Sequence, residues 1–365
     1  MRHRATARIG SFAVAASVAV AGSGLATHAA GQEARPTSVI LLVADGAGVA
    51  HWTLARFASD DLAVDRMPVA GLVNTRGWDH EITGSAAGAT ALATGVRTFI
   101  GAIGVGPDSL PRESALELAS GRGWATGLIT TTSVADATPA AFAAHVASRD
   151  EMVEIFRQMT AAPVDVILGG GRNLLARALE RDSLDLRSEL EERYAYVETA
   201  AALEDAVAGG SGRVLGLFAP GSMARAGERT PSLVEMTRAA LAILEKDEDG
   251  FFLMVENEGS DTEAHANAER DVLTAEMLDF DAAVGVALDH RERNPGTLVV
   301  VVADHETGGI HLTHDANRDI VMGYATTYHT AALVPLFAAG PGAERFSGMR
   351  DNDEVGRALM ELMGR

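Results

Sequence analysis

Short apolar runs recur along most of the chain, and each is followed by glycines or polar residues. The stretch SVILLVADGAG at 38–48 is rich in β-branched residues up to Asp45 and then turns to glycine and alanine. This pattern predicts a buried parallel strand that ends in a functional loop. Six further runs have the same character, and they lie at 126–132, 164–171, 213–219, 251–256, 297–306 and 334–340.

Segments rich in Ala, Leu, Glu and Arg separate these runs and predict helices at 148–161, 231–247, 266–291 and 351–363. Strands that alternate with helices indicate an α/β fold, with a mostly parallel central sheet and helices on both of its faces. The sequence contains no internal repeat and no long low-complexity linker. We therefore expect a single domain over residues 37–365.

The N-terminus has the pattern of an export signal. Three arginines within the first eight residues precede an apolar run over 12–21, and Gly, Ser and Gly at 22–24 interrupt that run too early for a membrane anchor. We expect a signal peptide over residues 1–29, cleaved near Ala29, followed by a polar linker over 30–36. The mature chain would then be periplasmic or secreted, with no stable membrane anchor.

Composition narrows the class of partner. Of the 365 residues 47% are apolar, which is enough to fill a large core, and the formal net charge is −20. Nucleic acids and anionic membranes would be repelled, whereas an anionic small substrate stays open because bound metal ions can invert the charge of a pocket. The chain has no cysteine, which excludes disulfides, thiolate metal sites and a lipid anchor on cysteine.

Acidic and imidazole side chains concentrate where the apolar runs end. Asp45 closes the first run, Glu256 closes the run at 251–256, and Asp304 with His305 follows the run that begins at 297. The carboxyl ends of parallel strands meet at one edge of a sheet, so these side chains are candidates for a common site. Adjacent residues on a strand point to opposite faces, so Asp304 and His305 can reach one metal ion only if the strand ends there.

Asp261 and His265 in DTEAH are four residues apart, which places them on one face of a helical turn. A carboxylate and an imidazole together suit zinc or a similar divalent ion, although a solvated pair is the commoner meaning of this spacing. His329 by itself is typical of a hydrogen-bonded loop histidine.

Residues 81–95, EITGSAAGATALATG, place Ser85 between Gly84 and a run of small residues. Small residues let other groups approach the backbone, and a helix N-terminus favours an anion, although an ordinary helix cap is the commoner meaning of such a stretch taken alone. Asp136 and Thr138 before Pro139 have the pattern of a capped helix start, and Arg149 that of a surface arginine.

Taken in order, the stretches DGAG, SAAGATALATGVRTFIGAIGV, DATPAAFAAHVASR, VILGGGR, VENEGSDTEAHAN, ADHETGG and YHTAALVPLFAAGPGA resemble the alkaline phosphatase family. The resemblance spans most of residues 38–345. It implies hydrolysis of phosphate monoesters, and it implies that Ser85 is the nucleophile that becomes phosphorylated and that Arg149 binds the phosphate. The substrates would be small phosphorylated molecules.

The same resemblance implies two zinc ions and one magnesium ion. One zinc would be held by Asp261, His265 and His329, and the second by Asp45, Asp304 and His305. Magnesium would share Asp45 and use Thr138 and Glu256, with Asp136 in the same site directly or through water.

The chain departs from the family pattern at three places. Many members carry an acidic residue before the nucleophile, where this chain has Gly84, so we expect Arg149 to be more mobile. Glu258 is a second candidate beside Glu256, but only Glu256 keeps the family's spacing to Asp261.

The segment from His305 to His329 spans only 24 positions, so we expect the family's crown-type insertion to be short or absent. The oligomeric state, monomer or homodimer, stays open. His311 and His314 lie in this segment, with a loop role or an accessory ligand role as the alternatives.

Two other functions remain alternatives. A phosphodiesterase or phosphonate hydrolase of the same superfamily could use a similar two-metal platform, although Arg149 and a third metal site suit the monoester dianion better. The formylglycine precursor pattern of sulfatases is missing after Ser85. An inactive exported module that binds phosphate or metal is the other alternative, although every nucleophile and ligand position is filled.

Overall fold

A computed structural model describes residues 35–365, except for the side chains of residues 181–187 within one helix. The expected signal peptide at 1–29 and residues 30–34 of the expected linker lie outside the described residues. The described residues belong to one compact unit. None of the helices in this part of the chain is long and apolar enough to cross a membrane.

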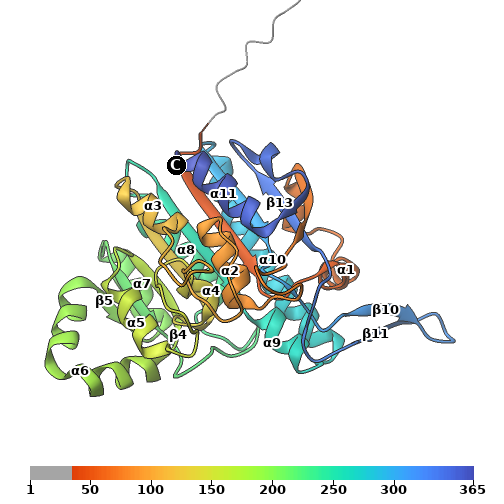
Figure 1. Cartoon of the computed structure of the whole chain (residues 1–365), viewed down its shortest axis with the longest axis horizontal. Helices are drawn as coiled ribbons and strands as arrows, with labels where there is room; N and C mark the ends of the chain where they lie inside the picture. The colour runs from red at the N-terminus through yellow and green to blue at the C-terminus, as the bar shows by residue number, and fades with distance from the viewer. Residues whose placement is uncertain (1–34) are drawn as a thin grey trace, which may run out of the picture. The chain divides into compact units, whose positions relative to one another are not determined.

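A ten-stranded sheet forms the centre of the protein (Figure 1), in the order β14-β2-β13-β8-β1-β7-β3-β4-β6-β5. Its neighbours pair in parallel except β13, which runs antiparallel to both β2 and β8. The strands are β1 (Ser38–Ala44), β2 (Val69–Asn74), β3 (Ala125–Ser133), β4 (Val166–Gly170), β5 (Ala195–Val197), β6 (Val214–Leu217), β7 (Phe251–Asn257), β8 (Thr297–Val302), β13 (Val334–Ala339) and β14 (Gly348–Asp351).

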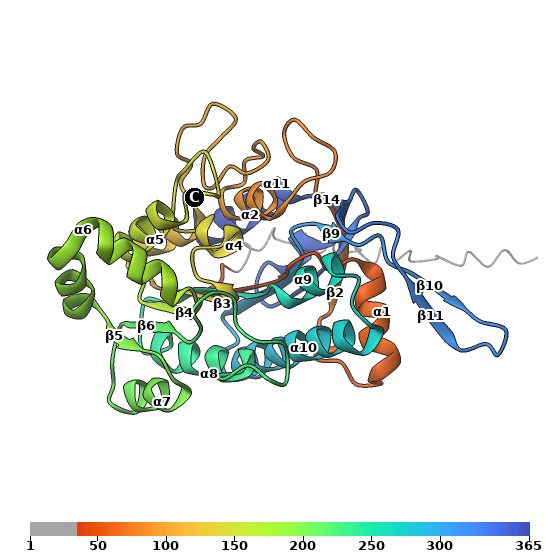
Figure 2. The same ribbon diagram turned by 90° about the horizontal axis from the view of Figure 1, so that it is seen from below.

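Helices cover both faces of this sheet (Figure 2). One layer contains α2 (Ser85–Thr94), α3 (Ala115–Gly121), α4 (Ala137–Ala140), α5 (Met152–Ala161), α6 (Arg172–Arg193) and α11 (Asn352–Met363). The opposite layer contains α1 (Val49–Ala58), α7 (Ala200–Ala208), α8 (Leu233–Leu244) and α10 (Arg270–Arg293). The short helix α9 (Gly259–His265) follows β7, and the 3-10 turns η1 (Ala63–Arg66) and η2 (Ala343–Phe346) complete the helical elements. The predicted mostly parallel α/β architecture is confirmed.

All seven predicted apolar runs form strands of the central sheet. Every residue of the central strands β1, β7 and β8 is buried, which explains why they are continuous apolar runs rather than alternating ones. The predicted strand at 297–306 is too long, because β8 ends at Val302 and the chain turns before Asp304. The sequence analysis missed the edge strands β5 and β14 and the strand β2 next to β14, which are short and only partly buried and so lack an apolar run.

The segment between β8 and β13, where the sequence predicts a short or absent insertion, is small. It consists of β9 (Glu306–Thr307), which pairs with β12 (His329–Thr330), and a projecting hairpin of β10 (His311–His314) and β11 (Ile320–Gly323). Figure 1 shows this hairpin extending away from the sheet. His311 and His314 are exposed on β10, and neither belongs to a metal-type cluster among residues 35–365.

Helix α2 is buried along its entire length, from Ser85 to Thr94. Its small side chains let it approach its neighbours closely. A Cβ atom on Gly88 would lie 2.6 Å from the carbonyl oxygen of Asp304, and one on Gly356 of α11 would lie 2.3 Å from the carbonyl oxygen of Ala91. The Ala and Gly run therefore brings the start of α2 against the chain that follows β8.

Candidate functional site

The site is built where three adjacent central strands end. Asp45 follows β1 directly, Glu256 is near the end of β7, and Asp304 and His305 follow β8. All four residues have an exposed fraction of 0%. Parallel pairing puts these strand ends side by side, so residues separated by more than 200 positions in the sequence meet.

The turn after β8 lets the side chains of Asp304 and His305 point to the same side of the chain. The Asp304 Oδ1 atom accepts hydrogen bonds from the backbone N–H groups of Gly46, at 3.3 Å, and of His305, at 3.1 Å. The other oxygen of Asp304 then lies 3.4 Å from His305 Nε2, and Asp45 Oδ1 lies 3.3 Å from the same nitrogen. Asp45, Asp304 and His305 thus form one group that could hold a cation.

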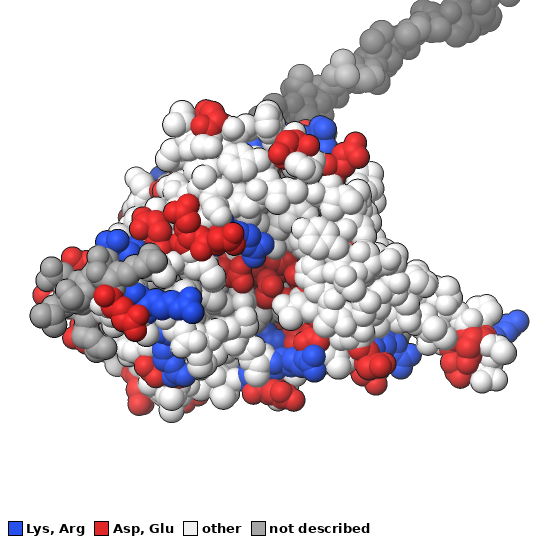
Figure 3. All heavy atoms as spheres, turned by 60° about the horizontal axis from the view of Figure 1, so that its bottom comes forward, with Lys and Arg blue, Asp and Glu red and all other residues white. Residues whose placement is uncertain are grey.

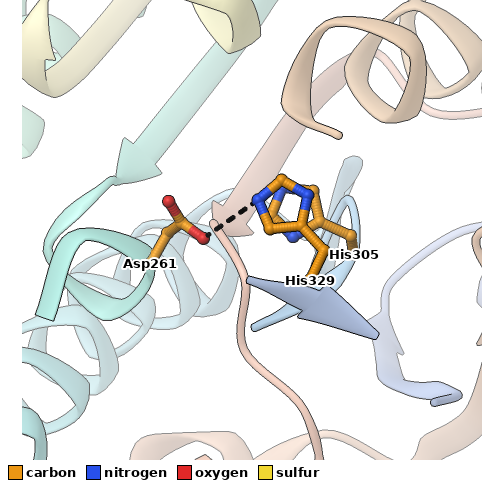
Figure 4. A group of neighbouring side chains, drawn as sticks. All are labelled: Asp261, His305 and His329. Carbon is orange, nitrogen blue, oxygen red and sulfur yellow. Dashed lines mark ion pairs between the residues drawn. The ribbon is translucent and has the colours of Figure 1, made fainter. Parts of the chain in front are cut away.

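A second group lies beside the first and comes from α9 and β12. His265 Nε2 is 3.2 Å from Asp261 Oδ2 and 3.1 Å from His329 Nε2, and His329 Nε2 is 3.8 Å from Asp261 Oδ1. The His305 ring stacks on the His329 ring with centroids 3.7 Å apart (Figure 4). His305 therefore lies at the junction of both groups, and Asp261, His305 and His329 are also close enough to share an ion.

Backbone contacts orient the two imidazoles of the second group. His265 Nδ1 lies 2.7 Å from the carbonyl oxygen of Thr327, and His329 Nδ1 lies 2.7 Å from that of Thr83. A carbonyl oxygen only accepts, so each Nδ1 carries a proton, and each ring, when neutral, turns the lone pair of Nε2 inward. The hydrogen bond to Asp261 raises the pKa of His265, so its Nε2 is the atom that holds a proton when no metal is bound. Two such lone pairs 3.1 Å apart, beside a carboxylate, repel one another unless a cation or a proton lies between them. The donor set therefore fits zinc.

Thr307, which the sequence analysis did not single out, orients His305 in the same way. Its hydroxyl donates to Asp261 Oδ1, so its oxygen is left to accept from His305 Nδ1 at 3.2 Å. This leaves His305 Nε2 with its lone pair toward Asp45 and Asp304. A threonine within ADHETGG carries no sequence signal for such a role, because the role depends on β9 lying beside α9.

Burial shifts the protonation of the clustered groups. Burial and the nearby carboxylate of Asp304 raise the pKa of Asp45 well above its ordinary value, and burial raises the pKa of Glu256 to about 8. Burial lowers the pKa of His305 and of His329 to about 4, so both imidazoles are neutral. A metal site without its cations is expected to combine neutral imidazoles with carboxylates that retain protons, because metal binding displaces those protons.

Ser85 is the first residue of α2 and lies against this cluster. Its Oγ is 3.2 Å from His305 Nε2, and the residue is 5% exposed. Gly84 precedes it, and a Cβ atom there would lie 3.3 Å from His329 Cε1. The small residues around Ser85 therefore leave room for the two imidazoles beside its hydroxyl.

A third group of carboxylates lies on the other side of Asp45 and consists of Asp45, Glu256 and Glu258. Thr138 donates to Asp45 Oδ2 at 3.4 Å, and Thr130 donates to Glu256 Oε2 at 2.5 Å. The structure thus brings together Asp45, Thr138 and Glu256, the residues expected around magnesium, and adds Glu258. The sequence analysis chose Glu256 over Glu258, whereas both carboxylates face the group.

Arg149 and Asp136 contact each other directly. Arg149 Nη2 donates to Asp136 Oδ1 at 2.7 Å, and the side chain of Arg149 is 38% exposed. Asp136 also accepts from the backbone N–H of Ala137 and from the hydroxyl of Thr132. Asp136 is therefore occupied as the partner of Arg149 and is not a member of the third carboxylate group.

The bottom of the protein in Figure 1, where α9 lies, is turned forward in Figure 3. This view shows a hollow floored by Asp and Glu side chains, with Lys or Arg side chains nearby. Acidic groups without a cation would repel a phosphate dianion, so bound cations are needed before this face can attract one.

Comparisons with known proteins agree with the geometry. The family profile described as alkaline phosphatase matches residues 37–321. Streptomycin-6-phosphate phosphatase of Streptomyces griseus is 36% identical, with 90% of each chain covered. Alkaline phosphatase 3 of Bacillus subtilis is also 36% identical, over 89% of this chain and 88% of that protein.

Among solved structures, the alkaline phosphatase of the Antarctic bacterium TAB5 superposes with a TM-score of 0.85 at 32% identity, over 91% of this chain and 99% of that one. A variant of that enzyme is described with Mg bound in its M3 site.

Proposed function

The chain belongs to the alkaline phosphatase family, whose activity is hydrolysis of phosphate monoesters, and we propose that it acts through a phosphoserine on Ser85 with two zinc ions and one magnesium ion. The observation that carries this proposal is the position of the Ser85 hydroxyl, 3.2 Å from His305 Nε2 and thus at the junction of the two His and Asp groups.

The zinc ions would be held by Asp261, His265 and His329 and by Asp45, Asp304 and His305, and the magnesium ion by Asp45, Thr138 and Glu256. When bound, such ions lower the pKa of an attacking hydroxyl and neutralise charge on the oxygen that departs. The inward lone pairs of the histidines and the buried, partly unpaired carboxylates support this assignment.

The residues of the chain then have separate tasks. Arg149 forks onto two oxygens of the phosphate and fixes the monoester so that the Ser85 oxygen attacks phosphorus in line. The bond from phosphorus to the alcohol oxygen breaks, and phosphoserine forms. Water then attacks the phosphoserine from the side that the alcohol has left, the bond to Ser85 Oγ breaks, and inorganic phosphate is released.

The α2 helix also favours phosphate binding at the Ser85 oxygen. Ser85 lies at its N-terminus, where unpaired backbone N–H groups and the helix dipole favour the negative charge of a phosphate. The ten-residue helix is packed along its length, so the hydroxyl is positioned by the core rather than by a mobile loop.

The proposal is tested with a chromogenic phosphate monoester. Protein stripped of metal should be inactive, zinc alone should restore part of the activity, and zinc with magnesium should restore all of it. The matching diester should be hydrolysed far more slowly, because it has one negative charge fewer and an esterified oxygen where Arg149 binds. Equal rates on both esters would favour a phosphodiesterase, and phosphate binding without turnover would favour an inactive binding module.

We also propose that the chain is exported and cleaved near Ala29. N-terminal sequencing of protein recovered from the periplasm or the medium checks this. A mature protein that retains the first 29 residues would contradict it.

A further inference from the structure

Glu258 lies where its carboxylate can contribute to the third site. It is the residue before α9, and its backbone N–H donates to Thr131 Oγ1 at 2.9 Å. Oxygens of Glu258, Asp45 and Glu256 all lie within 4.8 Å of one another. Magnesium binds oxygens at about 2.1 Å, so ligands on opposite sides of one ion are about 4 Å apart. The three carboxylates need only a small inward movement to share a cation.

The group also contains an unsatisfied buried atom. Glu256 Oε1 has no hydrogen-bond partner within residues 35–365, and Glu256 is 0% exposed. A buried carboxylate oxygen without a donor is costly, and three carboxylates that face one another repel as well. A divalent cation at their centre removes both costs.

Asp136 is more fully hydrogen-bonded than Glu258, whose Oε1 accepts from Thr262 Oγ1 at 3.3 Å. Asp136 Oδ1 accepts from Arg149 and from the backbone of Ala137, and its Oδ2 accepts from Thr132, whose own oxygen lies 2.9 Å from Ser222 Oγ. In the family pattern an acidic residue before the nucleophile helps to hold the arginine, and Gly84 cannot do so here. Asp136 supplies the missing carboxylate.

We propose that Glu258 is a direct ligand of the third cation in this chain, and that it takes over the ligand role that the resemblance gives to Asp136, which is used instead to hold Arg149. The inference rests on the proposed function, because it requires that a third cation binds. With Glu258, the site has three carboxylates and the Thr138 hydroxyl and no nitrogen donor, so it should select hard cations such as Mg²⁺ or Mn²⁺ over zinc.

Direct metal binding tests this without an activity assay. Mn²⁺ is titrated into zinc-loaded full-length protein, and free Mn²⁺ is followed by electron paramagnetic resonance. Zinc occupies the histidine sites more tightly than Mn²⁺, so the titration reports the oxygen site. We expect one Mn²⁺ per chain in the unmodified protein and at least a tenfold higher Kd in Glu258→Gln.

Two variants serve as comparisons. Glu263→Gln removes the same charge from α9, the helix that Glu258 precedes, but Glu263 pairs with Arg225 at 2.5 Å. The Kd of this variant for Mn²⁺ should therefore stay within twofold of that of the unmodified protein. Asp136→Asn should raise the Kd less than Glu258→Gln does. A Glu258→Gln protein that binds Mn²⁺ as tightly as the unmodified protein overturns the inference, and so does an Asp136→Asn effect as large as that of Glu258→Gln.

If the proposed function is wrong, the result is different, because the unmodified protein then binds no third ion at all.

Thermal unfolding of the metal-free proteins checks folding. Glu258→Gln should be at least as stable as the unmodified chain because a repelling carboxylate is gone. Glu258→Asp, which keeps the charge and shortens the reach, is the second variant and should also weaken Mn²⁺ binding. Binding as tight as in the unmodified protein would contradict direct ligation.

Discussion

The guanidinium of Arg149 is held by the carboxylate of Asp136, with Nη2 donating to Oδ1 over 2.7 Å. The sequence suggested that Arg149 would be more mobile, because Gly84 replaces the acidic residue that precedes the nucleophile in many relatives. The structure gives Arg149 a different carboxylate, from the loop after β3. An arginine held in this way can present the rest of its fork to a phosphate.

Asp136→Asn should therefore weaken phosphate binding. A charge-assisted hydrogen bond contributes about 1.5–3 kcal/mol when buried, and partial exposure of Arg149 reduces this to about 1 kcal/mol, which corresponds to about a fivefold higher inhibition constant for inorganic phosphate. Asp150→Asn, at an exposed neighbouring position, is the control and should change the constant less than twofold. Unchanged phosphate inhibition in Asp136→Asn would show that Asp136 does not position Arg149.

Gly88→Ala should disturb the reactive end of α2. The added Cβ would lie 2.6 Å from the backbone oxygen of Asp304, so the helix must move away from the end of β8 and carry Ser85 with it. Overpacking of this kind costs about 1–3 kcal/mol of stability, and we expect kcat to fall at least tenfold, as roughly 1 Å of misplacement can cost a hundredfold.

Gly121→Ala is the matched control in α3, where nothing lies within 4 Å of the added Cβ. It should gain about 0.5–1 kcal/mol by helix propensity and leave kcat unchanged. Denaturant unfolding and steady-state kinetics measure both variants. Wild-type kcat in Gly88→Ala would mean that the close contact between α2 and Asp304 is dispensable.

The metal-free protein should lose stability as the pH rises from 7.5 to about 8.5. Burial raises the pKa of Glu256 to about 8 in the folded protein, so the folded state keeps a proton that the unfolded chain has already released. His305 and His329 have folded pKa values of about 4, so protons leave them only in the unfolded chain as the pH passes 6.5, which raises stability there. Above pH 7.5 the unfolded histidines are nearly neutral as well, and this contribution is small. One such proton changes the free energy of unfolding by up to about 1 kcal/mol over this range.

Chemical denaturation across this pH range measures the slope. Zinc and magnesium should abolish it, because the carboxylates then bind cations instead of protons. Glu256→Gln should reduce it in the metal-free protein. A metal-free protein whose stability rises between pH 7.5 and 8.5 would contradict the raised carboxylate pKa.

The strand-end part of the site was predictable, because position at the end of an apolar run and residue type are both local properties. Asp45, Asp304 and His305 could be assigned to one edge of a parallel sheet before any coordinates were known. The small residues after Ser85 likewise indicated a close approach, which the distance from Gly88 to Asp304 now explains.

The remaining parts depend on tertiary contacts that leave no local pattern. Thr307 acts through hydrogen bonds to Asp261 and His305, and these exist only because β9 and α9 lie side by side. Spacing selected Glu256 over Glu258, but the turn from β7 into α9 lets both carboxylates face Asp45. The strands β2, β5 and β14 were missed for a similar reason, since their burial is decided by neighbours rather than by their own sequence.

The central claim is that the oxygen of Ser85 carries the phosphoryl group, and trapping that intermediate is its most direct test. Zinc- and magnesium-loaded protein is mixed with isotopically labelled inorganic phosphate at mildly acidic pH, quenched in acid, digested and analysed by mass spectrometry. We predict label on the peptide that contains Ser85 and none in Ser85→Ala, which should still bind its metals. Label that persists in Ser85→Ala, or that lies on another residue of the unmodified protein, would contradict the account.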